Sequence, residues 1–185
     1  MNTHTHTHHS TGAAFKKIVV AATLAACSGF AGAEECTSTL LFPWDAHGKV
    51  YEVAPKTLMF VGEIRGTVYA ETGKGALDAA SMRCPMLYEI DVTNGNTRGE
   101  GRCAIHPRGS SDMVYATYSC QGEIGSCAGQ LYLSGGTGRF EGISGSGGLV
   151  SRTGASELAV RLGPGGAISN AAGLMTLSEF SYSTP

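Results

Sequence analysis

Apolar and polar residues alternate along the chain with the period of a β-strand rather than that of a helix. The clearest run spans 57–71, where nearly every second residue is apolar or glycine. A period of two sustained over this length predicts a long strand with one apolar face. Gly62 and Gly66 lie on that face, and their missing side chains indicate sharp coiling, as at the corner of a barrel.

Further strands are predicted at regular spacing. They cover 86–92, 99–105, 113–120, 128–134, 149–150, 158–162 and 174–182. One helical turn is expected over 76–82. Asn94-Gly95 predicts a two-residue type I′ hairpin turn, because both of its central positions need a positive φ. About eight strands separated by glycine-rich turns indicate a barrel or a sandwich.

Composition favours an all-β chain and excludes some partners. Glycine supplies 27 of the 185 residues, and glycine is costly inside helices but useful in turns and bulges. The length fits one domain, and a hydrophobic content of 42% is enough for one core. The net charge of −2 leaves no basic excess to neutralise phosphates, so we expect no nucleic-acid partner.

The N-terminal segment has the pattern of an export signal. Lys16 and Lys17 precede the apolar run 18–26, and the small residues at 31–33 predict cleavage before Glu34. We therefore expect residues 1–33 to be removed and 34–185 to form the mature β-barrel domain. This domain would be periplasmic or secreted.

A second interpretation of the same segment changes the location. The run Leu24-Ala25-Ala26-Cys27 resembles a bacterial lipobox, in which Cys27 would carry lipid and become the mature N-terminus. The protein would then be an outer-membrane lipoprotein, and Cys27 would be its contact with the membrane. Both interpretations take the domain out of the reducing cytoplasm, so its cysteines can form disulfides.

Four cysteines are placed to form two disulfides. Cys84 and Cys103 flank the predicted Asn94-Gly95 hairpin, close enough across it to bridge after a small adjustment of register. Cys120 and Cys127 enclose a short, polar, glycine-bearing connection that a disulfide could close. We expect both pairs.

Metal binding is the alternative use of these cysteines. The CxxC spacing is absent, and His47 and His106 are solitary, so we expect no metal site. Cys36 is left over by the two predicted pairs. The sequence leaves open whether it is buried, free or paired between two chains.

The segment 134–147 is rich in glycine and has two interpretations. A phosphate cradle would need a preceding parallel strand and a following helix, which the pattern does not provide. The structural interpretation is a tight turn over Gly135–Gly138 and Phe140 as a plug of the core. A glycine-rich strand would then allow its neighbours to approach closely.

The residues Gly-Gly-Thr-Gly-Arg-Phe-Glu-Gly-Ile-Ser-Gly-Ser-Gly at 135–147 resemble the signature of the allene oxide cyclase-like and dirigent-like β-barrel superfamily. The likeness to small exported bacterial members covers roughly 57–150. It also involves segments 99–103, 112–116, 120–122 and 127–129. The resemblance implies an eight-stranded antiparallel barrel with a hydrophobic cavity, often in an oligomer.

Plant relatives in this superfamily cyclise a fatty-acid epoxide or steer the coupling of phenolic radicals by shaping a pocket. They use neither a metal nor an organic cofactor, so the resemblance implies none here. Their functional residues cannot be matched to positions of this chain, and none is transferred. Together with the strand pattern, the resemblance predicts an all-β fold with a single antiparallel closed β-barrel of about eight strands.

Glycines on the strands predict free space inside such a barrel, because they stand where bulky side chains would otherwise fill it. They are Gly62, Gly66, Gly99, Gly101 and Gly129. The candidate ligand pocket lies next to Phe60, Tyr88 and Tyr115, as an apolar cavity with a few polar groups at one mouth. Trp44 is expected to cover an end of the barrel.

Glu63 is the candidate catalytic residue. If its face of the strand lines the barrel, the partly desolvated carboxylate could act as a base. If that face points outward, Glu63 and Arg65 form an ordinary solvated pair. The sequence leaves both faces open.

Three functions remain compatible with the pattern. The first is a binding module that holds a small apolar or aromatic molecule, with a homo-oligomer as a compatible state. The second is a cofactor-independent isomerase, cyclase or lyase that acts on such a molecule. The third is a structural barrel filled by its own side chains.

Overall fold

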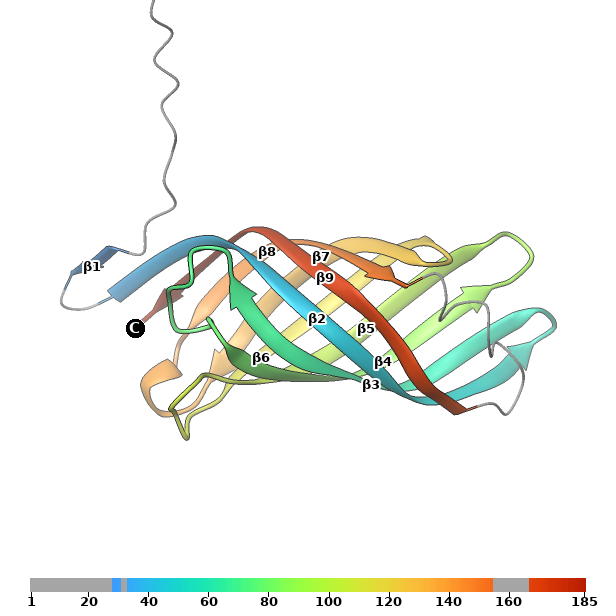
Figure 1. Ribbon diagram of the computed structural model, residues 1–185, viewed down its shortest axis with the longest axis horizontal. Helices are drawn as coiled ribbons and strands as arrows, with labels where there is room; N and C mark the ends of the chain where they lie inside the picture. Colours follow the sequence, from blue (N-terminus) through green and yellow to red (C-terminus); the bar gives the residue numbers. More distant parts are fainter. Residues whose placement is uncertain (1–27, 31–32, 155–166) are drawn as a thin grey trace, which may run out of the picture.

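The computed structural model describes residues 28–30, 33–154 and 167–185, which form nine strands and no α-helix (Figure 1). The strands are β1 (Ser28–Phe30), β2 (Ala33–Ala54), β3 (Thr57–Ala70), β4 (Ala80–Asp91), β5 (Asn96–His106), β6 (Val114–Glu123), β7 (Ser126–Gly136), β8 (Ser144–Thr153) and β9 (Ala167–Thr184). A single 3-10 turn, η1 (Gly138–Phe140), follows β7 in this part of the chain. The described residues contain no helix with the length and apolarity needed to cross a membrane.

Strands β2 to β9 form one closed antiparallel barrel, as predicted. Each strand pairs with the next along the chain, and β9 returns to pair with β2. The row of cross-strand partners that begins at Val50 on β2 comes back to β2 at Leu40, ten residues away. Such an offset tilts the strands and leaves an interior that side chains, or one small ligand, can occupy.

The alternation predicted for 57–71 separates the inside of the barrel from the outside. Leu58, Phe60, Ile64 and Val68 of β3 are all 5% exposed or less, whereas Arg65, between Ile64 and Gly66, is exposed. The other strands follow the same rule. Apolar burial on the inward face therefore fixes the register, because a slip of one residue would turn every apolar side chain outward.

The two ends of the barrel differ. The hairpin end, on the right in Figure 1, carries the tight turns around 55–56, 92–95 and 124–125. The loop end, on the left, carries the loops 71–79, 107–113 and 137–143. Three residues of these loops, Leu77, Phe140 and Ile143, are at most 3% exposed and belong to the buried apolar core. Phe140 is thus the plug that the sequence predicted.

The hairpin between β4 and β5 differs from the predicted type I′ turn. Asp91 and Asn96 are the last paired residues, so the loop has four residues, and of Asn94 and Gly95 only Gly95 has a positive φ, +72°. The Asp91 carboxylate accepts hydrogen bonds from the backbone N–H groups of Thr93 and Asn94, at 2.9 and 3.1 Å. This local cap stabilises the longer loop in place of the two-residue turn.

The longer loop shifts the register so that Cys84 lies opposite Cys103, with 4.0 Å between their Cα atoms. The predicted disulfides Cys84–Cys103 and Cys120–Cys127 are both formed. All four sulfur atoms belong to inward-facing residues of the barrel. Cys36, whose state the sequence left open, is 2% exposed and also disulfide-bonded.

Several other expectations need correction. Residues 76–79 form a turn instead of a helical turn, since β4 begins at Ala80 and Ala79 has a positive φ of +54°. Strand β2 has no counterpart among the predicted strands. The sequence placed Trp44 over an end of the barrel. In the structure Trp44 lies near the middle of β2, and its side chain is buried among the core residues. β1 falls within the segment predicted to be removed, and the strand expected at 158–162 lies outside the described residues.

Candidate functional site

The structure brings together two of the three predicted pocket residues. Phe60 on β3 and Tyr88 on β4 are direct cross-strand partners, and both side chains face the barrel interior. Phe60 is 4% exposed, whereas Tyr88 and its inward-facing neighbour Met86 are only partly buried. Met86 and Tyr88 therefore keep some accessible surface although they occupy inward-facing positions of β4.

Hydroxyl groups lie on the same stretch of the inner wall. The Tyr118 hydroxyl of β6 donates to the Met86 sulfur at 3.3 Å, and the Thr97 hydroxyl of β5 donates to the Glu123 carbonyl at 3.3 Å. Burial raises the pKa of Tyr118, with a further contribution from Tyr88. Burial also raises the pKa of Tyr88, although a hydrogen bond with Thr97 opposes the shift. Both phenols therefore stay neutral near pH 7.

Tyr115, the third predicted pocket residue, lies on the wrong face for a pocket inside the barrel. Its side chain is 42% exposed on the outer surface of β6, while Val114, Ala116 and Tyr118 face inward. The strand carries a tyrosine on each face, so alternation alone did not select the right one. The parity of Cys120 would have done so, because the buried disulfide places every second residue before it inside.

Glu63 also lies on the outer face, so the condition for its role as an internal base is not met. Its carboxylate accepts a hydrogen bond from Arg83 Nη2 at 2.7 Å, and the pair is accessible to solvent. Glu63 therefore forms a solvent-accessible ion pair on the outer face, with Arg83 and not with Arg65 as its partner. Arg65 turns instead to Asp45, its cross-strand neighbour on β2, at 3.0 Å.

Asp45, His47 and Arg65 form a charged cluster on the outer surface of β2 and β3. One Asp45 carboxylate oxygen lies 2.5 Å from His47 Nε2 and 3.0 Å from Arg65 Nε. Partial desolvation opposes the effect, but the hydrogen bond from Arg65 and the contact with His47 hold the pKa of Asp45 below its usual value. The side chains are 41–48% exposed, so the cluster is an accessible surface feature.

The glycines predicted to leave free space are covered by aromatic rings or by backbone atoms. A Cβ added at Gly62 would run into the His47 carbonyl of β2 and the Phe60 ring of its own strand. One added at Gly99 would run into the Tyr88 ring, and one at Gly101 into the Tyr118 ring, each from a neighbouring strand. At Gly66 and Gly129 a Cβ would meet backbone carbonyls. The interior space is therefore smaller than the glycine count implied, because rings and backbone take up the missing side-chain volume.

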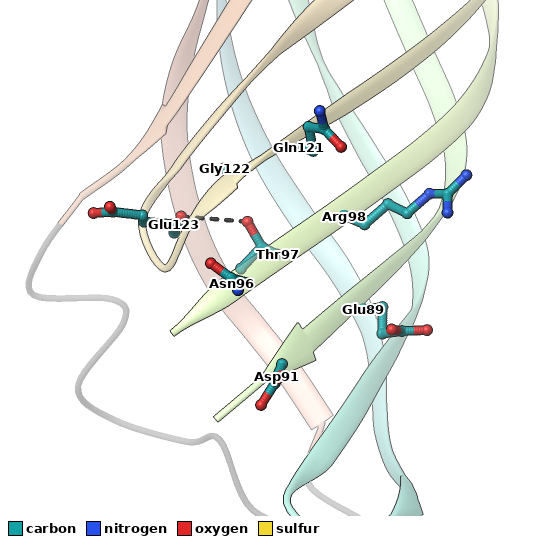
Figure 2. A pocket seen from close by; sticks show the side chains of 8 residues that line it. All are labelled: Glu89, Asp91, Asn96, Thr97, Arg98, Gln121, Gly122 and Glu123. Carbon is teal, nitrogen blue, oxygen red and sulfur yellow. Dashed lines mark hydrogen bonds between the residues drawn. The ribbon is translucent and has the colours of Figure 1, made fainter. Parts of the chain in front are cut away.

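A groove on the outer surface near the hairpin end offers a different kind of site. It has a volume of about 530 Å³, and its lining residues are Glu89, Asp91, Asn96, Thr97, Arg98, Gln121, Gly122 and Glu123. Figure 2 shows Glu89 and Arg98 extending away from the barrel on neighbouring strands, and the bond from Thr97 to Glu123 beneath the groove. Its charged and amide groups suit a polar ligand, not an apolar one.

Comparison with protein-family models, with curated proteins and with solved structures finds no match to the chain. The choice between these sites therefore depends on their geometry and chemistry.

Proposed function

We propose that the protein binds a small apolar or aromatic molecule inside the barrel, in the half nearer the hairpin end. One observation carries the proposal: Met86 and Tyr88 point into the barrel and yet remain partly accessible. An inward-facing apolar surface that water can reach is surface that a ligand can bury. Phe60, directly across from Tyr88, adds an aromatic wall.

The chemistry of this wall limits the ligand. Aromatic rings and a thioether favour flat or aliphatic groups, and Met adapts to irregular shapes. The phenol of Tyr88 can donate one hydrogen bond. Because rings already cover the glycines, the ligand we expect is small, closer to a single ring than to a long fatty acid.

The proposal is tested by filling the site with a side chain. Met86→Trp places a bulky ring in the accessible stretch, whereas Leu87→Trp places the same ring on the outer face one residue away. The apolar fluorophore N-phenyl-1-naphthylamine should bind the parent and Leu87→Trp alike, and Met86→Trp at least tenfold more weakly. No binding to the parent, or equal binding to both variants, would overturn the proposal.

The filled structural barrel is the second candidate, and the rings seated over Gly62, Gly99 and Gly101 favour it. It predicts that the parent binds no apolar probe. The isomerase, cyclase or lyase alternative has lost its candidate base, because Glu63 points outward. Turnover by this protein would have to use other groups, such as the tyrosine hydroxyls of the inner wall.

We also propose that the protein is an exported member of the allene oxide cyclase-like superfamily, periplasmic or secreted. The disulfides Cys84–Cys103 and Cys120–Cys127 are compatible with an oxidising compartment. The intact mass of the exported protein should correspond to a chain beginning at Glu34. A mass for a chain beginning at acylated Cys27 would establish the lipoprotein instead.

A further inference from the structure

The outer wall of the barrel carries a row of four side chains that runs across β2, β3, β4 and β5. Its members are direct cross-strand partners, in the order Lys49, Val61, Leu87 and Glu100. All four side chains are exposed, Val61 to 43% and Leu87 to 41%. The row therefore has a positive end, an apolar centre and a negative end.

Apolar surface continues on both sides of the row. Met59 of β3 and Pro85 of β4 lie two residues from Val61 and Leu87 and face the same outer side. Tyr51, the partner of Met59 on β2, is 47% exposed. An exposed apolar patch with charged groups at its rim is typical of a surface that binds another protein.

The charges at the two ends of the row are available to a partner. Within the described parts of the chain, the ion pairs involve neither Lys49 nor Glu100. Arg98, the neighbour of Glu100 on the outer face of β5, takes part in none of them either. Pairing these groups with charges on a second molecule therefore breaks no ion pair of the barrel itself.

We propose that a second copy of the chain binds this wall, with the two-fold axis of the dimer running along the strands between β3 and β4. Such an axis makes β2 face the partner's β5 and β3 face the partner's β4. Lys49 then meets Glu100 of the partner subunit, and Val61 meets Leu87 of the partner subunit. By symmetry each contact forms twice. The order of charges in the row is thus complementary to itself, which favours a second copy over an unrelated protein.

The next row toward the hairpin end fits the same arrangement. Tyr51, Met59, Glu89 and Arg98 are cross-strand partners in this order. The axis therefore brings Tyr51 over Arg98 of the partner subunit, which is a cation–π contact. In this dimer the apolar side chains of β3 and β4 touch at the crest of the curved wall. The longer side chains of β2 and β5 reach across the gap on either side.

The curvature also limits the strength of the dimer. A contact over four strands, about 4.8 Å apart, and a few residues of each buries less than about 1,200 Å² in total. Further along the strands Arg65 and Arg83 face the partner, where Asp45 and Glu63 of the same chain neutralise them. We therefore expect a weak dimer that dissociates on dilution.

Analytical ultracentrifugation of the oxidised exported protein tests the proposal. Between about 5 and 500 µM the average mass should rise from that of a monomer toward that of a dimer. Lys49→Glu and Glu100→Lys each place like charges at both ends of the interface, and each should weaken dimerisation about tenfold or more. Lys74→Glu, a charge reversal on the exposed loop 71–79, is the matched control and should dimerise like the parent.

An equimolar mixture of the two interface variants gives the sharpest result. In the mixed dimer the introduced glutamate faces the introduced lysine, and the native Glu100 faces the native Lys49. Dimerisation should therefore return to the level of the parent. A parent that stays monomeric throughout, interface variants that dimerise like the parent, or a mixture that associates no better than its components would each overturn the proposal. The test does not depend on the proposed ligand, whose site lies on the inner face of the barrel.

Discussion

The ring of Tyr88 lies over the Cα atom of Gly99, its direct cross-strand partner on β5. A side chain at position 99 would meet ring atoms Cδ2 and Cε2 of Tyr88 at 2.8 and 3.2 Å from its Cβ. The glycine therefore allows the tyrosine to lie flat against the wall. The same packing recurs where the Tyr118 ring lies over Gly101. These two inward-facing rings thus pack against glycines of a neighbouring strand.

Gly99→Ala should destabilise the protein by about 1–3 kcal/mol, because the added methyl group forces the Tyr88 ring from its place. Gly148→Ala is the matched control, since it is also a glycine within a strand and its Cβ would have one heavy atom nearby, Gln130 Nε2 at 4.0 Å. The control should stay within about 0.5 kcal/mol of the parent in urea unfolding. Equal effects at the two positions would contradict this account.

The disulfides Cys84–Cys103 and Cys120–Cys127 should contribute unequally to stability. Cys84–Cys103 joins residues 19 apart and Cys120–Cys127 residues 7 apart. On the loop-entropy scale, the longer loop is worth about 3 kcal/mol and the shorter about 2.5 kcal/mol. Replacing the first pair by alanines should therefore lower the free energy of unfolding more than replacing the second. The reverse order would show that packing of the sulfur atoms dominates over chain entropy.

Hairpin 92–95 provides a test of backbone conformation. Gly95→Ala should cost about 1 kcal/mol or more, because Gly95 is left-handed at φ +72°. Asn94→Ala should cost less, since Asn94 lacks a positive φ and loses mainly the exposed bond from its Nδ2 to Asp91. In a type I′ turn both positions would be left-handed. Comparable losses at 94 and 95 in thermal unfolding would therefore favour that turn.

Asp45 makes the stability dependent on pH at the acid end. Its pKa in the folded protein lies below the ordinary aspartate value of 3.8, so its ionised form is favoured by folding. The stabilisation is thus fully present above pH ~4 and is lost as the pH falls through the lowered folded-state pKa. Because the cluster is exposed, Asp45→Asn should cost at most about 1 kcal/mol at pH 7.

The measurement is the difference in unfolding free energy between the parent and Asp45→Asn from pH 7 down to pH 2. The difference should shrink toward zero at the acid end, and 1 M salt should reduce it at pH 7. A difference that grows on acidification would mean that the contacts of Asp45 with Arg65 and His47 are not its source.

Strong alternation of apolar and polar residues made much of the barrel predictable. Strand β2 was not predicted, and the reason is physical. Its inward positions Ala46 and Gly48 are small because the barrel needs that volume for other side chains, such as the Phe60 ring over Gly48. Small inward residues and Pro43 on the outward face remove the apolar stripe by which a strand is recognised. The partners that explain this composition come from another strand, so a local pattern does not reveal them.

The candidate site shows the same limit. Phe60 and Tyr88 were found because their strands have clearly apolar faces, but alternation alone did not assign the faces of Tyr115 and Glu63. The glycines were noticed, yet a sequence does not tell an empty position from one covered by a neighbour's ring. Trp44 drew attention as a large aromatic residue, while its position near the middle of a strand emerges only when the strand pairing is known.

The pairing of β2 with β9 also sets an order of events in folding. It joins Glu34 to Thr184, so the barrel cannot close until nearly the whole chain is available, and such long-range pairing is intrinsically slow. Cys84 and Cys103 are 0% and 3% exposed once the wall is complete. An oxidant can thus reach these thiols readily only while β2 and β9 are apart. We therefore expect oxidation to precede closure, and a chain that closes first to stay reduced until it reopens.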